Sequence, residues 1–220
     1  MLNSKLKIQS SKLYYLFSAL LVLVFSAIWL NTGYSNAFRT DLKHSILNEL
    51  IYINPPAPGA TVDAIYVLGG SQRSLELKYK TAADLFHKGI CKRIWILSSP
   101  GKTEYSRSLR RNLTNDEWSV LKFKEYGVPE ENVEPIKIDE GFFGTFSEAK
   151  GISSLIKGRG YKDILLISSY EHTYRVKISF ENFLKSQNIK TYTQGSGQKV
   201  LLRHALVEFI KLKVYQYLLV

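Results

Sequence analysis

The chain is constrained most by a repeated alternation between short, uninterrupted apolar segments and segments with helical periodicity. Strands are expected over residues 63–68, 93–97, 132–138, 163–168 and 190–192, and helices over 75–88, 116–126, 145–157, 173–185 and 200–219. Apolar strands without polar interruptions are typical of parallel sheets that are buried on both faces. We therefore predict an α/β fold, a three-layer Rossmann-like sheet, mostly parallel, with helices on both faces. The polar and basic stretch 102–115 is expected to be a loop.

An uncharged run lies near the N-terminus. Residues 13–30 would form about 27 Å of helix, close to the roughly 30 Å hydrocarbon core of a bilayer. Lys5, Lys7 and Lys12 precede this run, so the positive-inside rule places residues 1–12 in the cytoplasm and the main domain outside it. We expect a single-pass signal anchor in the inner (plasma) membrane. A signal peptide cleaved at Ser35-Asn36-Ala37 is the alternative.

The rest of the chain divides into a linker and one domain. Residues 31–61 are expected to hold a helix, over 38–53, and a stiff proline-rich linker, and residues 62–220 to form the α/β domain. Residues 41–220 contain 26 basic and 19 acidic side chains, a net charge of +7. A basic domain beside a membrane favours anionic partners such as lipid head groups or phosphates.

Several classes of site are excluded by composition and motif. Cys91 is the single cysteine, so there is no internal disulfide, and the four histidines form no metal-type pair. No P-loop, dinucleotide fingerprint or nucleophile elbow is present. We expect no metal and no nucleic-acid partner, and the sequence identifies no cofactor.

The candidate site lies in the loops that follow the strands, because ligands bind beyond the carboxyl ends of parallel strands. The first strand leads into Gly69-Gly70, where backbone amides can approach a ligand, and Arg73 follows. The loop after 163–168 holds Ser169, His172 and Arg175, the last two spaced i, i+3. A helix N-terminus with a guanidinium, an imidazole and a hydroxyl predicts an anion site.

These features also have purely structural interpretations. Gly69-Gly70 is then a tight turn, His172 and Arg175 are a helix cap and a surface pair, and Arg73 faces solvent. Thr145-x-x-Glu148 matches a helix capping box, and the alternative is that Glu148 reaches the site.

The C-terminal helix carries an apolar stripe that is expected to belong to the core, formed by Leu201, Leu202, Leu206, Phe209, Ile210 and Tyr217. A helix on the membrane surface is the alternative, since basic residues flank the stripe.

Residues 62–185 resemble the YdcF-like family, which includes the SanA and ElyC types of bacterial envelope protein. Four motifs in order carry the resemblance: Asp63–Gly70 (DAIYVLGG), with Lys78 at the family's arginine and Ala82–Gly89 (AADLFHKG); Gly127-Val128-Pro129; Asp139 ahead of Thr145 and Glu148; and Ser169, His172 and Arg175. Ser98 stands at the start of the family's Ser-Gly-Gly, which reads Ser98-Ser99-Pro100-Gly101 here.

The resemblance implies a membrane-anchored, extracytoplasmic protein that supports cell-envelope or surface-polysaccharide biogenesis and binds a phosphorylated or lipid-linked ligand. His172 is the expected general acid or base, and Asp139 is expected to orient it. The expected ligand-binding residues are Gly69, Gly70, Arg73, Ser98, Thr145, Glu148, Ser169 and Arg175. The alternative is a non-catalytic scaffold with a degenerate ligand site whose partners are other envelope proteins. Whether any reaction is catalysed stays open at this level.

Overall fold

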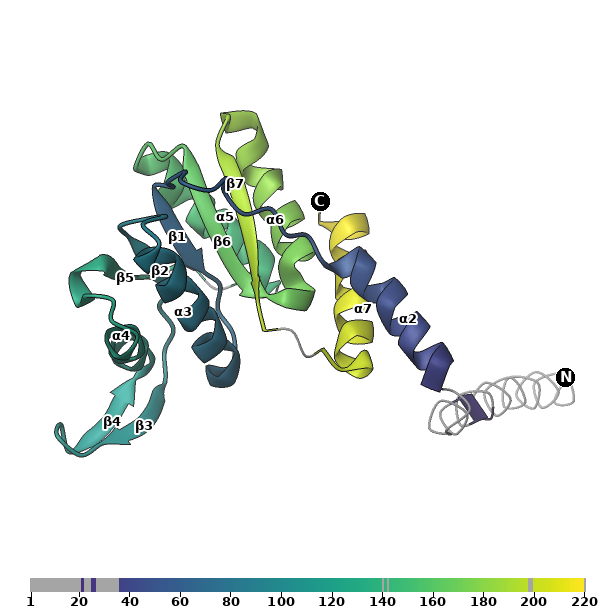
Figure 1. Cartoon of the computed structure of the whole chain (residues 1–220), viewed down its shortest axis with the longest axis horizontal. Coiled ribbons are helices and arrows are strands. Elements are labelled where there is room, and N and C mark those ends of the chain that lie inside the picture. The colour runs from purple at the N-terminus through teal and green to yellow at the C-terminus, as the bar shows by residue number, and fades with distance from the viewer. Residues whose placement is uncertain are drawn as a thin grey trace, which may run out of the picture. The chain divides into compact units, whose positions relative to one another are not determined.

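A computed structural model describes residues 21, 25–26, 36–139, 141, 143–197 and 200–219 (Figure 1). It separates into two units, residues 1–46 and 47–220. Helix α2 (Asn36–Leu50) matches the helix expected after the anchor. Most of the predicted span 13–30 lies outside the described residues, so the anchor stays a prediction. Within the described part, no helix is both long enough and apolar enough to cross a membrane.

The larger unit is built on the predicted parallel sheet. Its five strands lie in the order β5-β2-β1-β6-β7, and every neighbouring pair is parallel. The strands are β1 (Ala64–Val67), β2 (Ile94–Leu97), β5 (Val133–Ile136), β6 (Asp163–Ser169) and β7 (Lys190–Ser196). Strand β7 is longer than expected, because its polar second half continues to pair with β6 as far as Ser169 and Ser196.

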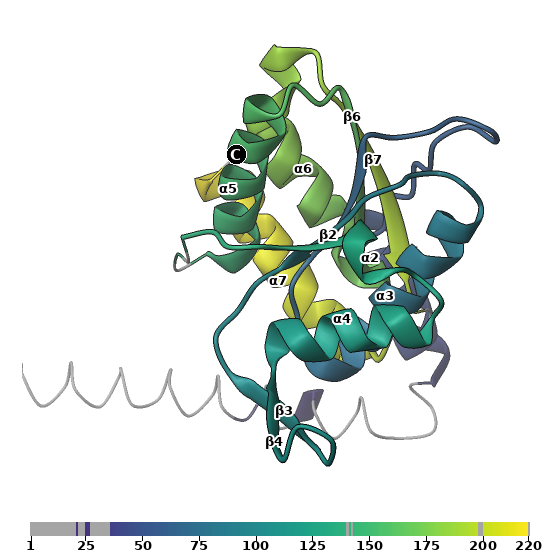
Figure 2. The ribbon, with the colours of Figure 1, turned by 90° about the vertical axis from the view of Figure 1, so that its left-hand side faces the viewer.

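Helices cover both faces of the sheet, as predicted (Figure 2). They are α3 (Gln72–His87), α4 (Asn115–Glu125), α5 (Gly144–Gly158), α6 (Thr173–Leu184) and α7 (Leu202–Leu218). Side chains alternate along β1: Ile65 and Val67 pack with α3 and α4, whereas Ala64 and Tyr66 pack with α5 and α6. Both faces are buried, which explains the unbroken apolar strands. Short 3-10 turns at Glu130–Asn132, Tyr170–His172 and Lys185–Gln187 join some of these elements.

The stretch 102–115 is not the loop that we expected. It forms an antiparallel hairpin of β3 (Lys102–Ser106) and β4 (Arg111–Thr114), with a break in register between Lys102 and Tyr105. The hairpin follows the carboxyl end of β2 and leads into α4. Its residues are mostly exposed, and Leu113 is its buried contact with the core.

The expected core stripe of α7 is also wrong. The buried residues of this helix are Ala205, Glu208, Leu212 and Tyr215, whereas Leu206, Ile210 and Tyr217 are exposed. Leu201, just before the helix, is exposed as well. The helix is apolar on more than one side, so its composition does not determine which side is buried.

The strand order places two loops side by side. The chain winds outward from β1 through β2 to β5 and then returns to β6 on the other side of β1. The carboxyl ends of β1 and β6 are therefore neighbours at the point where the winding reverses, with Val67 paired to Ile167. Such a reversal opens a crevice at the carboxyl ends of the strands, which is the usual ligand position in open α/β sheets.

Candidate functional site

A cavity of about 460 Å³ lies at this reversal point. Gly69, Gly70 and Ser71 of the loop after β1 line it, with Ser168, Ser169 and His172 from the end of β6 and the following turn. Helices α3, α5, α6 and α7 contribute the remaining polar side chains, which are Ser74, Lys78, Thr145, Glu148, Glu171, Arg175, His204, Glu208 and Lys211. The volume is in the range that holds a small ligand.

Two buried ionisable side chains hold the loop after β1. Glu148 Oε1 accepts hydrogen bonds from the Gly69 amide at 2.9 Å and the Tyr66 hydroxyl at 3.1 Å. The Lys78 ammonium donates to the carbonyl oxygens of Leu68, at 3.0 Å, and Gly69, at 2.7 Å. The loop backbone is therefore fixed before any ligand arrives, which limits the entropy lost on binding.

The predicted capping box at Thr145 and Glu148 is wrong. Helix α5 has Phe143 at its N-cap, a residue that supplies no side-chain capping bond. Thr145 Oγ1 instead accepts a 2.6 Å bond from Nη1 of Arg175, and Glu148 points to the loop after β1. Both residues thus belong to the wall of the cavity, the alternative that the sequence left open for Glu148.

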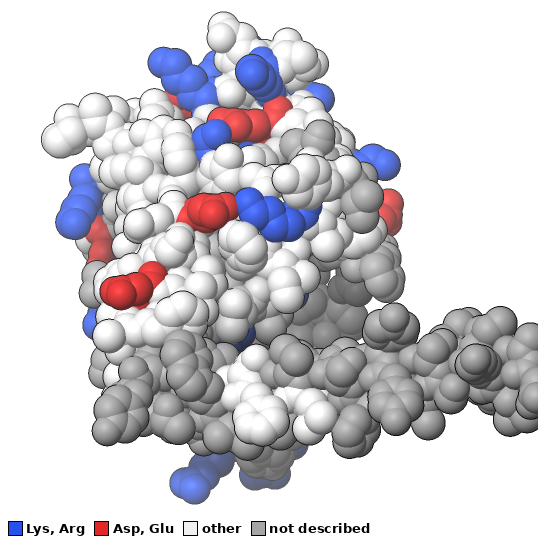
Figure 3. Space-filling view, turned by 90° about the vertical axis from the view of Figure 1, so that its right-hand side faces the viewer, with Lys and Arg blue, Asp and Glu red and all other residues white. Residues whose placement is uncertain are grey.

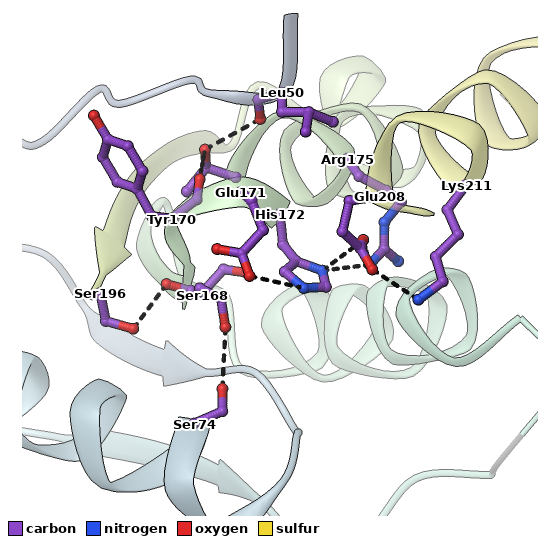
Figure 4. Close-up of polar contacts among 12 residues, drawn as sticks. Leu50, Ser74, Ser168, Tyr170, Glu171, His172, Arg175, Ser196, Glu208 and Lys211 are labelled. Atoms are coloured by element: carbon purple, nitrogen blue, oxygen red, sulfur yellow. Dashed lines mark hydrogen bonds and ion pairs between the residues drawn. The ribbon is translucent and has the colours of Figure 1, made fainter. Parts of the chain in front are cut away.

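A network of charged groups lines the cavity where α6 and the turn before it meet α7 (Figure 4). Glu208 Oε2 lies 3.0 Å from Nδ1 of His172 and accepts a 2.9 Å bond from Nη2 of Arg175. Its other oxygen accepts a 2.7 Å bond from Lys211. Nε2 of His172 faces Glu171 at 3.9 Å. The imidazole is held between two carboxylates, and Arg175 also contacts its Nδ1.

Burial shifts the proton affinities of these groups in opposite directions. It lowers the pKa of His172 to about 3, with a further lowering by Arg175 and an opposing effect of Glu208. Burial raises the pKa of Glu148, against the Gly69 amide and Lys78, and lowers the pKa of Lys78 to about 8. Burial also acts to raise the pKa of Glu208, but His172, Arg175 and Lys211 hold it below its usual value. Paired groups whose pKa values are displaced in opposite directions are typical of proton-transfer sites.

Arg175 is the most confined cation of the cavity. Its side chain is 8% exposed, and its guanidinium lies 5.0 Å from the centre of the Tyr215 ring. Its Nε is buried and has no hydrogen-bond partner among the described residues. A buried donor without an acceptor is unfavourable by about 1–3 kcal/mol, so Arg175 is held in this position at a cost to the folded chain.

The first turn of α3 faces the same cavity. Ser71 is its N-cap residue, in extended conformation, and its side chain forms no capping bond. The first amides of a helix have no partner within the helix. Together with Arg175, these donors make an arrangement that suits an anion.

Three of the predicted site residues lie elsewhere. Asp139 lies beside α5 in a separate depression with Lys137 and Lys150, so the structure does not bring it to His172. Ser98 Oγ donates a 2.7 Å bond to Asp116 and thereby joins the end of β2 to α4. Arg73 lines a neighbouring depression between α3 and the start of α7 rather than the cavity.

The other predicted residues do line the cavity: Gly69, Gly70, Thr145, Glu148, Ser169, His172 and Arg175. Ser169 Oγ bonds to Ser74 Oγ at 3.0 Å, which links the turn after β6 to α3.

The sequence does not indicate Glu208 and Lys211 as site residues, because the apolar stripe of residues 200–219 predicts a core helix. One signal was available, since Glu208 is the single acidic residue within Leu202–Leu218. A lone acid among apolar residues is rarely buried unless it is paired. The family motif pointed to Lys78, but not to its bonds with the loop carbonyls.

Charge and metal chemistry add two observations. Lys and Arg side chains are interspersed with Asp and Glu on the face drawn in Figure 3, so positive charge does not form one continuous patch there. Within the described residues, no group of three or more His, Cys, Asp or Glu side chains could hold a metal ion.

Comparison of the whole chain with protein-family models gives no match, and a search of curated proteins gives none either.

Proposed function

We propose that this chain is a membrane-anchored, extracytoplasmic protein that binds a phosphorylated or lipid-linked ligand in the cavity between β1 and β6. We further propose that it supports cell-envelope or surface-polysaccharide biogenesis. The anchor and compartment rest on the uncharged run 13–30 and the lysines before it. The envelope role rests on the resemblance of residues 62–185 to the YdcF-like family.

The confined guanidinium of Arg175 is the observation that carries the ligand class. Its guanidinium lines the cavity, and the uncapped start of α3 contributes amide donors to the same cavity. A phosphate group has enough acceptor oxygens to serve both. The cavity lies beyond the carboxyl ends of β1 and β6, where the winding of the sheet reverses, and this position supports the same proposal.

His172 is the proposed proton-transfer group. Its ring is neutral at pH 7, because burial and Arg175 lower its pKa. A bound anion would raise that pKa toward the range useful in catalysis, since a nearby negative charge favours the imidazolium. Glu208 takes the orienting role that the sequence assigned to Asp139, because it accepts a bond from the Nη2 of Arg175 that contacts Nδ1.

A specific observation also favours the non-catalytic scaffold as a second candidate. Glu208 already pairs with both Arg175 and Lys211, so each of these cations has a partner without any ligand. A scaffold would keep this network for stability, as a buried ion cluster whose disruption is costly.

A thermal-shift screen of the full chain in detergent distinguishes the ligand-binding protein from the scaffold. Polyprenyl phosphates, sugar phosphates, nucleotide sugars and inorganic phosphate form the panel. A ligand at about 100 times its dissociation constant should raise the melting temperature by about 5–10 °C. Arg175→Lys keeps a cation for Glu208 but removes Nε and the planar fork, and should abolish the shift.

Arg159→Lys is the matched control, since Arg159 pairs with Glu134 outside the cavity. It should change the basal melting temperature and leave the ligand shift intact. If no phosphorylated ligand shifts the wild-type chain, the ligand proposal is wrong and the scaffold is favoured.

A further inference from the structure

Helix α7 exposes an apolar stripe. Leu206, Val207, Ile210 and Tyr217 are all exposed, Ile210 at 62% and Tyr217 at 80%. Their spacings of three, four and seven residues place them on one side of the helix. We call these four residues the α7 stripe.

The stripe lies opposite the side of α7 that packs on the domain. Ala205, Glu208, Leu212 and Tyr215 are buried and follow the same helical spacing, displaced by about half a turn. The stripe therefore contributes nothing to the core, and it stays exposed in the part of the chain that the structure describes. An exposed run of large apolar side chains on one helix marks a surface that binds something.

Charge on α7 selects the kind of partner. Arg203 is exposed at the N-terminal end of the stripe, Lys211 is exposed at one edge of it, and Lys213 at the other edge pairs with Glu49. Glu208, the single acid of the helix, is buried and shared between Arg175 and Lys211, so these three side chains keep one net positive charge. The exposed surface of α7 is thus apolar and cationic, with a tyrosine at its C-terminal end. This composition is typical of helices that lie in the interface of an anionic bilayer.

We propose that the α7 stripe docks on the surface of an anionic lipid bilayer, with Arg203 and Lys211 toward the lipid phosphates. A symmetric contact between two copies would instead pair the stripe with an identical surface, on which the single acid of α7 is already buried and paired. The membrane anchor of the proposed function would hold the domain close enough for docking. The docking surface is otherwise independent of what the cavity binds.

Docking would place the mouth of the cavity at the lipid head groups. His204, Val207 and Lys211 of α7 line the cavity, and Val207 belongs to the stripe as well. A phosphate carried by a membrane lipid would then meet the cavity without leaving the bilayer surface.

Spin labels on the full chain in vesicles of phosphatidylethanolamine and phosphatidylglycerol test this proposal. One label replaces Ile210 (Ile210→Cys), and the matched label replaces Leu121 (Leu121→Cys), an exposed apolar residue on α4. Cys91 is buried, and burial raises its pKa to about 11, so it should not react. Collisions with oxygen report contact with lipid, and collisions with a water-soluble nickel chelate report contact with solvent.

We expect the label at 210 to collide more with oxygen and less with nickel than the label at 121. This contrast should weaken in vesicles of phosphatidylcholine alone. Equal solvent exposure at the two positions would overturn the proposal. Shielding of position 210 from both probes would overturn it in favour of a protein partner.

A second variant separates docking from ligand binding. Ile210→Glu should reduce oxygen collisions of a label at Tyr217 (Tyr217→Cys), because a carboxylate opposes insertion beside it. Ile210 does not line the cavity, so the same variant should keep any phosphate-induced thermal shift. Undiminished lipid contact at 217 would contradict the docking proposal whatever the cavity binds.

Discussion

The carboxylate of Glu148 accepts a 2.9 Å hydrogen bond from the backbone amide of Gly69. This bond joins α5 to the loop after β1, at the centre of the candidate site. A Cβ atom at position 69 would lie 3.0 Å from Glu148 Oε1 and 2.7 Å from Cδ2 of Leu97. Glycine is therefore needed here for the close approach of these two side chains.

Gly69→Ala should lower the free energy of unfolding by about 1–3 kcal/mol, because the added methyl group overpacks a buried site. Urea unfolding of the full chain in detergent measures the change. Gly158→Ala is the control: its Cβ would meet nothing within 4 Å. It should change stability by less than about 1 kcal/mol. Equal stability of the two variants would mean that Leu97 and Glu148 can shift freely.

Glu208→Ala should be among the most destabilising single changes. It leaves the buried guanidinium of Arg175 without its carboxylate partner, at a cost of about 3–5 kcal/mol. Lys211→Ala removes a half-exposed partner of the same carboxylate and should cost no more than about 1 kcal/mol. Thermal unfolding of both variants checks the difference. Similar losses would show that Arg175 is not the dominant partner of Glu208.

The sheet could be predicted because burial on both faces requires unbroken apolar strands, and this pattern is visible in the sequence. Residues of β1 such as Ile65 and Tyr66 face opposite helices and are both apolar. The hairpin of β3 and β4 has no such apolar pattern, since residues such as Lys102 and Arg111 are exposed and polar. Its pairing depends on backbone bonds rather than on an apolar pattern.

The sequence predicts those site residues that are close together along the chain. It does not predict a site residue whose partner is distant in the sequence. His172 and Arg175 share a loop and the start of a helix, so their proximity follows from their spacing. Glu208 reaches them from the last helix, and no local pattern distinguishes it from Asp139 as the partner of His172. Only the packing of α7 on α6 decides between the two carboxylates.

A second pair of residues with the capping-box spacing, at the start of α4, can be compared with Thr145 and Glu148. Thr114 and Glu117 form a real box at the start of α4, with both reciprocal bonds present. Thr145 and Glu148 have the same spacing but bond to Arg175 and Gly69. Glu117 keeps its capping bond although it also pairs with Arg111, whereas the tertiary partners of Thr145 and Glu148 replace the capping bonds.

Thr114→Ala should therefore lower the free energy of unfolding by about 1 kcal/mol and leave phosphate binding unchanged. Thr145→Ala should weaken ligand-induced stabilisation, because Arg175 loses the 2.6 Å bond that orients its guanidinium. Melting temperatures with and without ligand separate the two effects. The assignment fails if Thr114→Ala, rather than Thr145→Ala, reduces the ligand shift.

The pH dependence of stability should report the buried imidazole of His172. The folded chain has its pKa at about 3, and the unfolded chain at about 6.5. Between these values the unfolded chain binds a proton that the folded chain does not, so stability falls as the pH drops below about 6.5. The largest slope from one such group is about 1.4 kcal/mol per pH unit.

His172→Gln removes this group, so its free energy of unfolding should fall less steeply than that of the wild type between about pH 6 and pH 4. Glu134, whose pKa is lowered by Arg159, contributes equally in both proteins, whereas the pKa of Glu208 is held down in part by His172 itself. The difference between the two profiles therefore reports His172 together with its effect on Glu208. His87→Gln is the control, because its exposed ring bonds to the Tyr126 carbonyl outside the cavity. Urea unfolding across this range gives the slopes. Parallel profiles for wild type and His172→Gln would show that the imidazole takes up its proton without hindrance in the folded chain, and the proposed neutral histidine would be excluded.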